Sequence, residues 1–400
     1  MKALIVSESY PPTEGGVSTS TQRISQNLHR LGIDVHVYCF DNTYPINGED
    51  HYVEENDRGV LITKFGPFFV KQRSISLRDI THSERAILRR RVFDQMISHA
   101  HHQQFDVVMG FYLFDAGHLG LLLAREIKVP FVAAVRGNDI GENIFNAEKF
   151  GITRWIIEYA DAVVCVNEYL KNRLLIAFPG VNTKTTVIPN SINELANIQD
   201  KATCRQKVGD LCGWNKIDLR LTFIGSLREK KGIFVLLKAL SILRAELSVR
   251  LLVIGPEPKP SSLKTCETLW KDLVESGSIC VTGSLNRIEV LDWALGCDAI
   301  IMPSLDDGMA NGLLEGMALG LCPIVSSVFK DVVNDEVNGY VVERGNVAQL
   351  MIAIKKLAFD RERLHSLGDN ARISSTQWTP QNEANAYKAI FLSLIEKETI

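Results

Sequence analysis

The chain has 400 residues, of which 46% are hydrophobic and 23% charged, and its formal net charge is −3. This composition is too apolar and too evenly charged for a disordered chain, and it excludes a protein that coats nucleic acid by bulk electrostatic attraction. Because single hydrophobic cores stop growing at about 250–300 residues, the length predicts a globular protein of two or three domains, and we expect two.

The N-terminus and the cysteines indicate where the protein resides. The apolar run 3–6 is too short for a signal peptide and predicts a buried first strand, and no window approaches the roughly 20 apolar residues that span a bilayer. The eight cysteines show no Cys-x-x-Cys pair and no cluster with histidine. We therefore expect reduced core thiols in a cytoplasmic protein.

Apolar runs of four to six residues alternate with helix-periodic stretches along the chain, which predicts parallel strands covered on both faces by crossover helices. The predicted strands of the first half are 3–6, 34–39, 106–109, 131–135, 162–166 and 185–188. Those of the second half are 219–224, 250–254, 279–281, 299–302, 322–325 and 339–342. Near the C-terminus we expect helices over 346–357, 361–374 and after Pro380.

A polar stretch of weak periodicity, 189–214, separates the two halves. The sequence therefore predicts an α/β protein of two Rossmann-like, doubly wound domains facing across a cleft, residues 1–195 and 196–380, with a terminal helix of about 381–400 packing back on the first. Such sheets bind ligands at the carboxyl ends of their strands, so the strand-to-helix loops are the places to look for chemistry.

The first such loop, 11–17, carries the pair Gly15 and Gly16 and leads into a helix. Glycines let the backbone approach a ligand closely, and a helix N-terminus offers unpaired N–H groups to an anion. The dinucleotide fingerprint G-x-G-x-x-G is absent. The alternative interpretation is a plain tight turn.

The second loop runs from Gly225 to Gly232 and carries Arg228, Lys230 and Lys231. Cations between two glycines at a helix N-terminus favour a phosphate site, because the helix dipole and the side chains act together. The loop is not a Walker A motif. A solvated run of charges is the alternative.

The third loop, 303–318, follows a predicted strand and opens an apolar helix near Asn311. Asp307 and Glu315 stand eight residues apart, and carboxylates together with loop N–H groups can hold a polyol. Glu315 lies between apolar neighbours, where a carboxylate would be buried and would need partners. The alternative is a solvated glutamate.

Taken together, these segments resemble the retaining nucleotide-sugar glycosyltransferases of the GT-B fold, specifically glycosyltransferase family 4, also called glycosyl transferases group 1. The third loop is similar to the family's Glu-x7-Glu motif. The matching segments, in the family's order, are SYPPTEGGV, DAVVCVNEYLK, VIPNSI, GSLREKKG and MPSLDDGMANGLLEGMALG. The resemblance covers nearly the whole chain.

The resemblance implies a role for each matched residue. Lys231 would hold the donor diphosphate, Glu315 would bind the ribose hydroxyls, and Asp307 would lie near the transferred sugar. The resemblance assigns catalysis to Asp307, Lys231, Arg228 and Asp139. The remaining donor-binding residues that it implies are Gly15, Gly16, Gly225, Gly283, Arg287, Gly308, Met309, Ala310 and Asn311, with the backbone around 283–287 contacting the nucleobase.

Two departures from the family pattern lie in the donor loops. Asp307 stands where the family usually has glutamate, so its carboxylate is one methylene shorter. Ser226 occupies the usual position of a phosphate-binding arginine, and the nearest arginine is Arg228. Both departures bear on how the diphosphate and the sugar would be held.

A third departure lies in the first half, where the family's His-Gly-x-Asp stretch reads Arg136-Gly137-Asn138-Asp139. Arg136 is a permanent cation that cannot act as a general base near neutral pH, but it could bind a phosphate or an acidic acceptor. Asp139 could contact sugar hydroxyls. The alternative for Asn138 and Asp139 is a helix N-cap.

Histidines complete the candidate residues of the first half. His118 opens a predicted helix, and together with Arg136 and Asn138 it is a candidate for binding the acceptor; the alternative is a surface or capping histidine. His99, His101 and His102 lack metal-ligand spacing, so we predict no metal site.

The segment 65–91 is locally basic and aromatic and could dock on an anionic membrane or grip a phosphorylated acceptor. A solvated helix is the alternative. Its phenylalanines are Phe65, Phe68 and Phe69, and its cations are Lys71, Arg73, Arg78, Arg85, Arg89, Arg90 and Arg91, against Asp79 and Glu84.

The resemblance implies a retaining, metal-independent hexosyltransferase that requires no cofactor. It would move a sugar from a UDP- or GDP-sugar to a glycan, a lipid-linked or a small-molecule acceptor, in polysaccharide, lipopolysaccharide or glycolipid synthesis. We expect no nucleic-acid partner, and a cytoplasmic location that allows peripheral contact with the inner face of the membrane. The alternatives are a GT-B epimerase acting on a nucleotide sugar and a catalytically silent, glycosyltransferase-like binding protein.

Overall fold

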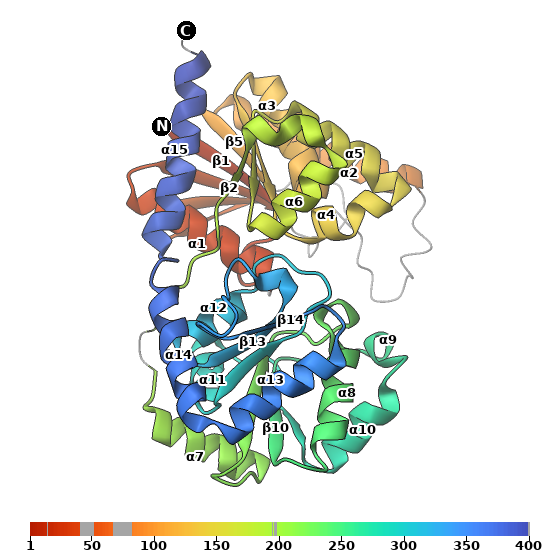
Figure 1. Cartoon of the computed structure of the whole chain (residues 1–400). Coiled ribbons are helices and arrows are strands. Elements are labelled where there is room, and N and C mark those ends of the chain that lie inside the picture. The colour runs from red at the N-terminus through yellow and green to blue at the C-terminus, as the bar shows by residue number, and fades with distance from the viewer. Residues whose placement is uncertain (14, 41–51, 67–81, 194, 196–197, 399–400) are drawn as a thin grey trace. The chain divides into compact units, whose positions relative to one another are not determined.

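The computed structural model describes residues 1–398 except 14, 41–51, 67–81, 194 and 196–197, and it divides into two compact α/β units (Figure 1). The first unit comprises Met1–Asn190 and Pro380–Ile400, and the second comprises Ser191–Thr379. The sequence places this division at 195/196 and the start of the returning helix at about 381.

The first unit is built on a sheet in the order β3-β4-β2-β1-β5-β6-β7-β8. Neighbouring strands are parallel, except that β3 and β4 are antiparallel. The strands are β1 (Lys2–Ser7), β2 (Asp34–Phe40), β3 (Tyr52–Asp57), β4 (Val60–Phe65), β5 (Val107–Phe111), β6 (Phe131–Val135), β7 (Ala162–Cys165) and β8 (Thr185–Val187). The six strands predicted for this half are confirmed, and β3 and β4 were not predicted.

The helices of the first unit connect the strands, and one returns from the end of the chain. They are α1 (Gly16–Arg30), α2 (His82–His101), α3 (His118–Ile127), α4 (Asn138–Gly141), α5 (Ala147–Tyr159), α6 (Glu168–Ala177) and α15 (Pro380–Glu398), with the short turns η1 (Leu113–Gly117), η2 (Asn143–Phe145) and η3 (Pro179–Lys184). Helix α15 packs on α1, and Tyr387 and Phe391 enter the core of this unit. A buried ion pair joins the two helices, with Arg23 Nε 2.9 Å from Glu383 Oε2.

The β3–β4 hairpin escapes prediction because β3 is an edge strand of mostly exposed, polar residues. Its two-residue loop, Arg58 and Gly59, has φ values of 56° and 91°. Two positive φ angles in a two-residue loop are the mark of a type I′ hairpin turn. The feature of the sequence that could have indicated the hairpin is therefore the turn at Arg58 and Gly59, because the polar residues of β3 give no strand pattern.

The second unit is a parallel sheet in the order β11-β10-β9-β12-β13-β14. Its strands are β9 (Leu219–Ile224), β10 (Val249–Ile254), β11 (Ile279–Val281), β12 (Ala299–Met302), β13 (Cys322–Ser326) and β14 (Tyr340–Val342). All six predicted strands are confirmed within one residue at each end. These strands could be predicted from the sequence because strands buried on both faces form nearly continuous apolar runs.

Helices flank the sheet of the second unit (Figure 1). They are α7 (Lys201–Cys212), α8 (Ile233–Leu243), α9 (Pro260–Leu263), α10 (Glu267–Glu275), α11 (Arg287–Leu295), α12 (Asn311–Ala318), α13 (Val347–Phe359) and α14 (Arg361–Ser375), with the short turns η4 (Glu229–Lys231) and η5 (Ser327–Phe329). The helices expected over 346–357 and 361–374 are confirmed as α13 and α14.

Each sheet has one point at which the strand order reverses. In the first unit, β1 lies between β2 and β5, and in the second unit β9 lies between β10 and β12. Open α/β sheets bind ligands outside the carboxyl ends of the strands at this reversal. We call the loops that follow β1 and β5 the first switch point, and those that follow β9 and β12 the second switch point.

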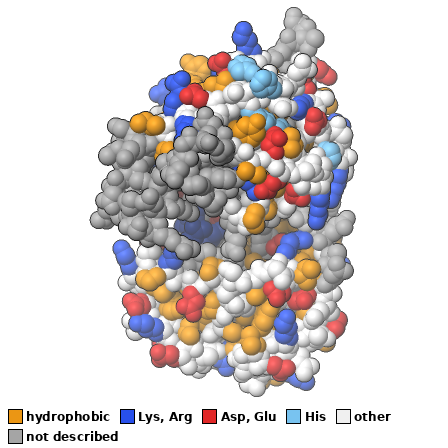
Figure 2. Space-filling view, turned by 180° about the vertical axis from the view of Figure 1, so that it is seen from behind, with side chains coloured by type: hydrophobic (Ala, Val, Ile, Leu, Met, Phe, Trp, Pro, Cys, Tyr) orange, Lys and Arg blue, Asp and Glu red, His pale blue; other side chains and the backbone are white. Residues whose placement is uncertain are grey.

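The cysteines are unbridged, and the surface is of mixed charge. Six cysteines are buried, whereas Cys212 and Cys280 are partly exposed and hydrogen-bond each other, so these two are not the core thiols that we expected. On the face drawn in Figure 2, acidic and basic side chains are interspersed. Among the described residues, no helix is both long enough and apolar enough to cross a membrane.

Candidate active site

At the second switch point, a lysine of the loop after β9 forms an ion pair with an aspartate of the loop after β12. Lys231, at the end of η4, forms an ion pair with Asp307 Oδ2, and the two side chains are only 17% and 12% exposed. The hydroxyl of Ser304 lies 3.4 Å from the same oxygen, and the N–H of Gly308 donates to Asp307 Oδ1 at 2.9 Å. Both oxygens of this carboxylate are therefore held in place.

Backbone contacts join these two loops independently of the ion pair. The carbonyl of Lys230 accepts hydrogen bonds from the N–H groups of Leu305 at 2.8 Å and Asp306 at 3.3 Å. Gly232 has a φ of 78°, and a Cβ there would lie 2.1 Å from the carbonyl oxygen of Pro303. Only glycine fits this close approach, so the loop geometry is set without a ligand.

A second cation–carboxylate pair joins two helices of this unit, α11, which follows β11, and α12, which follows β12. Arg287 is the first residue of α11, and its Nε lies 3.3 Å from Glu315 Oε1 on α12. Its Nη2 donates to the carbonyl of Asn193 at 3.1 Å. Glu315 is 18% exposed and paired, so its interpretation as a solvated glutamate is wrong. The sequence named both residues but did not reveal that they meet.

The other donor-site residues of the second unit lie at loop and helix starts. Gly225 follows β9 with a φ of 122°, and Gly283 has a φ of 76° and bridges to Gly255 beyond β10. The segment 308–311 leads into α12, of which Asn311 is the first residue and Ala310 the N-cap; Met309 is buried. Arg228 is exposed and forms no ion pair with any residue that the structure describes.

The candidate residues of the first unit lie on the loops of the first switch point and on the neighbouring β6 loop. Gly16 is the first residue of α1, and Gly15 is its N-cap with a φ of 142°. The guanidinium of Arg136 stacks 4.3 Å from the ring centre of Phe111 and hydrogen-bonds the side chain of Asn190. These contacts tie Arg136 into its own unit, and burial lowers its pKa.

Helix α4 begins at Asn138 and its N-cap is Gly137, so the N-cap interpretation of Asn138 and Asp139 is wrong. Asp139 is fully buried, and its Oδ2 accepts from the N–H of Arg136 at 2.8 Å. Burial raises the pKa of the Asp139 carboxyl to about 6.

Sequence reasoning missed Glu8, the first residue after β1. Burial, together with the charges of the nearby carboxylates of Asp115 and Asp139, raises the pKa of its carboxyl to about 8. No motif marks Glu8. The only signal in the sequence was its place directly after the strand at which the sheet order reverses.

His118 is the first residue of α3, as predicted. Its ring meets that of Trp155 edge-on at 5.8 Å between centroids, and its pKa is lowered by burial and then by the charge of Arg89. A neutral imidazole therefore stands beside the first switch point.

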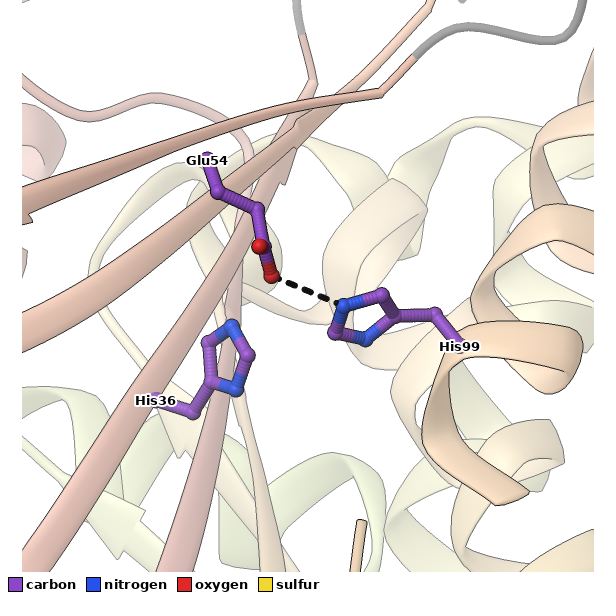
Figure 3. Close-up of side chains that lie close together, drawn as sticks. All are labelled: His36, Glu54 and His99. Carbon is purple, nitrogen blue, oxygen red and sulfur yellow. Dashed lines mark hydrogen bonds and ion pairs between the residues drawn. The ribbon is translucent and has the colours of Figure 1, made fainter. Parts of the chain in front are cut away.

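His99 does not cluster with His101 and His102 but with His36 and Glu54, whose candidate metal-ligand atoms all lie within 4.8 Å of one another (Figure 3). Hydrogen bonds account for this cluster. His99 Nε2 lies 2.9 Å from Glu54 Oε1, and His36 Nε2 lies 2.6 Å from the hydroxyl of Thr63.

Metal-binding histidines usually donate their second ring N–H to a fixed partner. His36 Nδ1 is buried and has no such partner among the described residues. The cluster is therefore best described as a hydrogen-bond network of two buried histidines and the exposed Glu54 that connects β3 to β2, β4 and α2.

Most of the basic segment 65–91 lies outside the described residues. Within the described part, Phe65 is fully buried, Arg89 pairs with Asp115 at 2.7 Å, and Arg90 pairs with Asp94 at 2.8 Å. Ile87 on α2 is 66% exposed and lines a groove of about 710 Å³ together with Tyr52, Ala86, Arg90, Arg91, Asp94, Gln95 and Ser98.

Comparisons with known proteins agree with this architecture. Two family models match the chain, "Glycosyltransferase Family 4" over residues 14–194 and "Glycosyl transferases group 1" over residues 218–360. The chain is 23% identical to the alpha-monoglucosyldiacylglycerol synthase of Acholeplasma laidlawii, over 99% of this chain and 98% of that protein.

Two solved structures share the fold. Sucrose-phosphate synthase of Thermosynechococcus elongatus superposes with a TM-score of 0.79 at 16% identity, and the match covers 99% of each chain. HepE of Anabaena, solved in complex with UDP and glucose, superposes with a TM-score of 0.76 at 15% identity over 98% of this chain and 100% of that one. The two α/β units therefore have the GT-B architecture.

Proposed function

The chain belongs to the glycosyltransferases that these two family models describe, and we propose that it is a retaining enzyme that transfers a sugar from a nucleoside diphosphate sugar to a hydroxyl acceptor. We assign donor binding to the second unit and acceptor binding to the first. The observation that carries this proposal is the Lys231–Asp307 pair on two loops that backbone hydrogen bonds and Gly232 hold together.

The chemistry of the second switch point suits a nucleotide sugar. As the bond between the sugar and the diphosphate breaks, negative charge develops on the leaving diphosphate, and a positioned cation stabilises it. Lys231 would supply that charge, with Arg228 and the N-terminus of α12 adding to it, so the reaction needs no metal ion. Glu315 would accept hydrogen bonds from ribose hydroxyls, since carboxylates are pure acceptors.

For retention we propose front-face attack, in which the acceptor oxygen bonds to the anomeric carbon on the face from which the diphosphate departs. The leaving phosphate takes the acceptor's proton, which balances the step without a protein nucleophile. UDP-glucose is the first donor to test, because HepE was solved with UDP and glucose. A lipid-linked acceptor is favoured by the similarity to a glycolipid synthase.

The test is incubation with UDP-, GDP- and ADP-glucose while nucleotide release and the fate of the sugar are followed. Nucleotide release with an α-linked product, undiminished by EDTA, supports a retaining, metal-independent transferase. A β-linked product would contradict retention, and a loss of activity in EDTA would contradict metal independence. An epimerised sugar would instead indicate an epimerase, and tight donor binding without turnover a silent binding protein.

We also propose that the groove on α2 contacts an anionic membrane peripherally. Ile87 is exposed beside Arg90 and Arg91, and an apolar side chain flanked by arginines suits the boundary between headgroups and acyl chains. Flotation with vesicles containing phosphatidylglycerol should recover the parent protein but less of Ile87→Glu. Ile352→Glu, at an exposed position of the second unit, is the matched control; equal recovery of both variants would refute the contact.

A further inference from the structure

A carboxylate at the end of β3 joins three side chains from an earlier part of the chain. Asp57 is the last residue of this strand. Its Oδ2 accepts hydrogen bonds from Nε2 of Gln22 at 2.7 Å and from Nε2 of Gln26 at 2.8 Å. The same oxygen accepts a third hydrogen bond, from the hydroxyl of Tyr10 at 2.9 Å, and Tyr10 is buried. One oxygen of the hairpin therefore holds donors from both β1's loop and α1.

These donors lie on both sides of Gly15 and Gly16, which we call the glycine pair. Tyr10 precedes the pair in the loop after β1, and the two glutamines follow it, one helical turn apart on the same face of α1. Gly15 is the N-cap of α1 and Gly16 its first residue. Because α1 is one continuous helix, a contact that holds its middle also sets where its first turn lies. Asp57 therefore positions the glycine pair from both flanks.

The glycine pair is open to a ligand at the first switch point. A Cβ at Gly15 or at Gly16 would meet nothing within 4 Å, and no side chain of the described residues caps the start of α1. The first N–H groups of a helix have no partner within the helix and can donate to the oxygen atoms of a ligand. The position of these N–H groups therefore matters for any ligand that binds there.

Two further contacts define what the removal of Asp57 would change. The hairpin turn packs closely on α1, because a Cβ at Gly59 would lie 2.2 Å from Nε2 of His29. Independently of the hairpin, Oγ of Ser7 at the end of β1 lies 2.8 Å from Oγ1 of Thr21 on α1. Without Asp57, α1 would therefore stay attached to the sheet but would lose the contact that joins it to the loop and the hairpin together.

The hydrogen bonds also act on the Asp57 carboxyl itself. Burial raises its pKa, but the hydrogen bonds from Gln22, Tyr10 and Gln26 oppose this and hold the pKa below its ordinary value. Asp57 is therefore ionised at neutral pH. Hydrogen bonds to an ionised acceptor are stronger than those between neutral groups, which suits a carboxylate that holds two segments in place.

We propose that Asp57 is a positioning residue for sugar transfer, which holds the glycine pair in place through Tyr10, Gln22 and Gln26. Asp57 touches no reacting atom in this role and exchanges no proton. The inference rests on the proposed function, and it adds the β3–β4 hairpin to the parts of the first unit on which the reaction depends.

The experiment compares Asp57→Ala with the conservative variant Asp57→Asn, using nucleotide release from UDP-glucose by the full chain. Asp57→Ala leaves three donors without their acceptor. Because a misplacement of about 1 Å can slow a reaction by about 100-fold, kcat should fall by about 10–100-fold. Asp57→Asn keeps an acceptor oxygen and should retain most of the rate. The affinity for UDP should stay that of the parent in both variants, because we assign donor binding to the second unit.

Glu55→Ala is the matched control on the same strand. Among the described residues, the Glu55 carboxylate pairs with Lys64 of β4 at 2.6 Å rather than with α1. This variant weakens the hairpin without removing the acceptor, so its kcat should stay that of the parent. Hydrogen exchange of residues 15–26 gives a readout that needs no activity: it should be faster in Asp57→Ala and unchanged in Asp57→Asn and Glu55→Ala.

Four outcomes would overturn the inference: an unchanged kcat in Asp57→Ala, an equal loss in Asp57→Asn, an equal loss in Glu55→Ala, or a UDP affinity that falls as much as kcat does. The second would assign the effect to the charge, and the last two to a general loss of structure. If the parent released no nucleotide from any donor, the proposed function would fail instead. Hydrogen exchange would still show whether Asp57 holds α1.

Discussion

At the second switch point, the carboxylates of Asp307 and Glu315 each have a cation within reach, whereas at the first switch point Glu8 forms no ion pair with any described residue. The second unit therefore holds these two carboxylates in ion pairs. Glu8 forms no ion pair among the described residues, and burial raises the pKa of its carboxyl, which favours the protonated form. The two switch points share one topology, but Asp307 at the second is bound to a cation and Glu8 at the first is not, although Asp115 at the first also pairs with Arg89.

This difference suits two kinds of ligand. A diphosphate can replace Asp307 as the partner of Lys231, because one anion is exchanged for another and the cation never stands alone. An uncharged hydroxyl can both accept a hydrogen bond from a neutral carboxyl and donate one to it, whereas a carboxylate only accepts. The comparison therefore predicts that charge changes act mainly on the donor in the second unit and mainly on the acceptor in the first.

The largest expected effect is that of Lys231→Ala. A hydrogen bond to a charged group contributes about 1.5–3 kcal/mol, so losing it at the leaving diphosphate should slow turnover roughly 10–150-fold. Steady-state nucleotide release with saturating donor measures this. Lys238→Ala removes an equal charge from an exposed position of α8 and should leave the rate unchanged. Full activity of Lys231→Ala with each donor that the parent uses would refute the assignment of Lys231 to the diphosphate.

The next effect is on the stability of the first unit. Because the folded state raises the pKa of Glu8 from 4.5 to about 8, it holds a proton that the unfolded chain releases, and stability falls as pH rises through this window. The slope from this one group can reach about 1.4 kcal/mol per pH unit.

Urea unfolding between pH 6.5 and 8 tests this slope, since the pKa of Asp139, at about 6, lies below the range. Glu8→Gln cannot ionise and should lose the part of the slope that Glu8 contributes, while Glu148→Gln, at an exposed position of α5, should keep the slope of the parent. Parallel curves for the parent and Glu8→Gln would show that Glu8 is already ionised at neutral pH, and the contrast between the two switch points would disappear.

The sequence predicted most of the strands that are buried on both faces, because an apolar run such as 299–302 is typical of such a strand, but it missed β4, most of whose residues are buried. The sequence also failed to predict β3, because Glu54 and Glu55 lie on an edge strand whose residues are mostly exposed and therefore show no alternation of apolar and polar residues. Edge strands face water on one side and need no continuous apolar run.

The candidate site divides in the same way. Lys231, Asp307 and Glu315 were found because each lies in a strand-to-helix segment with a recognisable spacing of glycines and charges; Lys231 and Asp307 lie in the loops, and Glu315 lies in α12. The pairing of Arg287 with Glu315, 28 residues apart, follows from the adjacency of α11 and α12 and leaves no periodic trace in the sequence. Glu8 was missed because its raised pKa depends on burial and then on the charges of Asp115 and Asp139, and only the folded chain buries Glu8 and brings these carboxylates near it.

The smallest expected effect, and the sharpest test of the comparison, is that of Asp307→Asn on the binding of UDP. In the free protein, Lys231 is held by Asp307, so a diphosphate must first displace that carboxylate. Ion pairs that keep contact with solvent contribute about 0.2–1 kcal/mol, so removing the competing charge should tighten UDP binding by up to about fivefold. Asp306→Asn, one residue earlier in the same loop, is the control for charge alone.

Titration calorimetry with UDP should therefore give opposite signs for the two partners of one ion pair: weaker binding for Lys231→Ala and tighter binding for Asp307→Asn. Sugar transfer should fall in both variants, because Asp307 is also assigned to the transferred sugar. If Asp307→Asn bound UDP no more tightly than Asp306→Asn, the carboxylate would not compete with the diphosphate. Lys231 would then reach its ligand without exchanging partners, and the second switch point would be a rigid anion site.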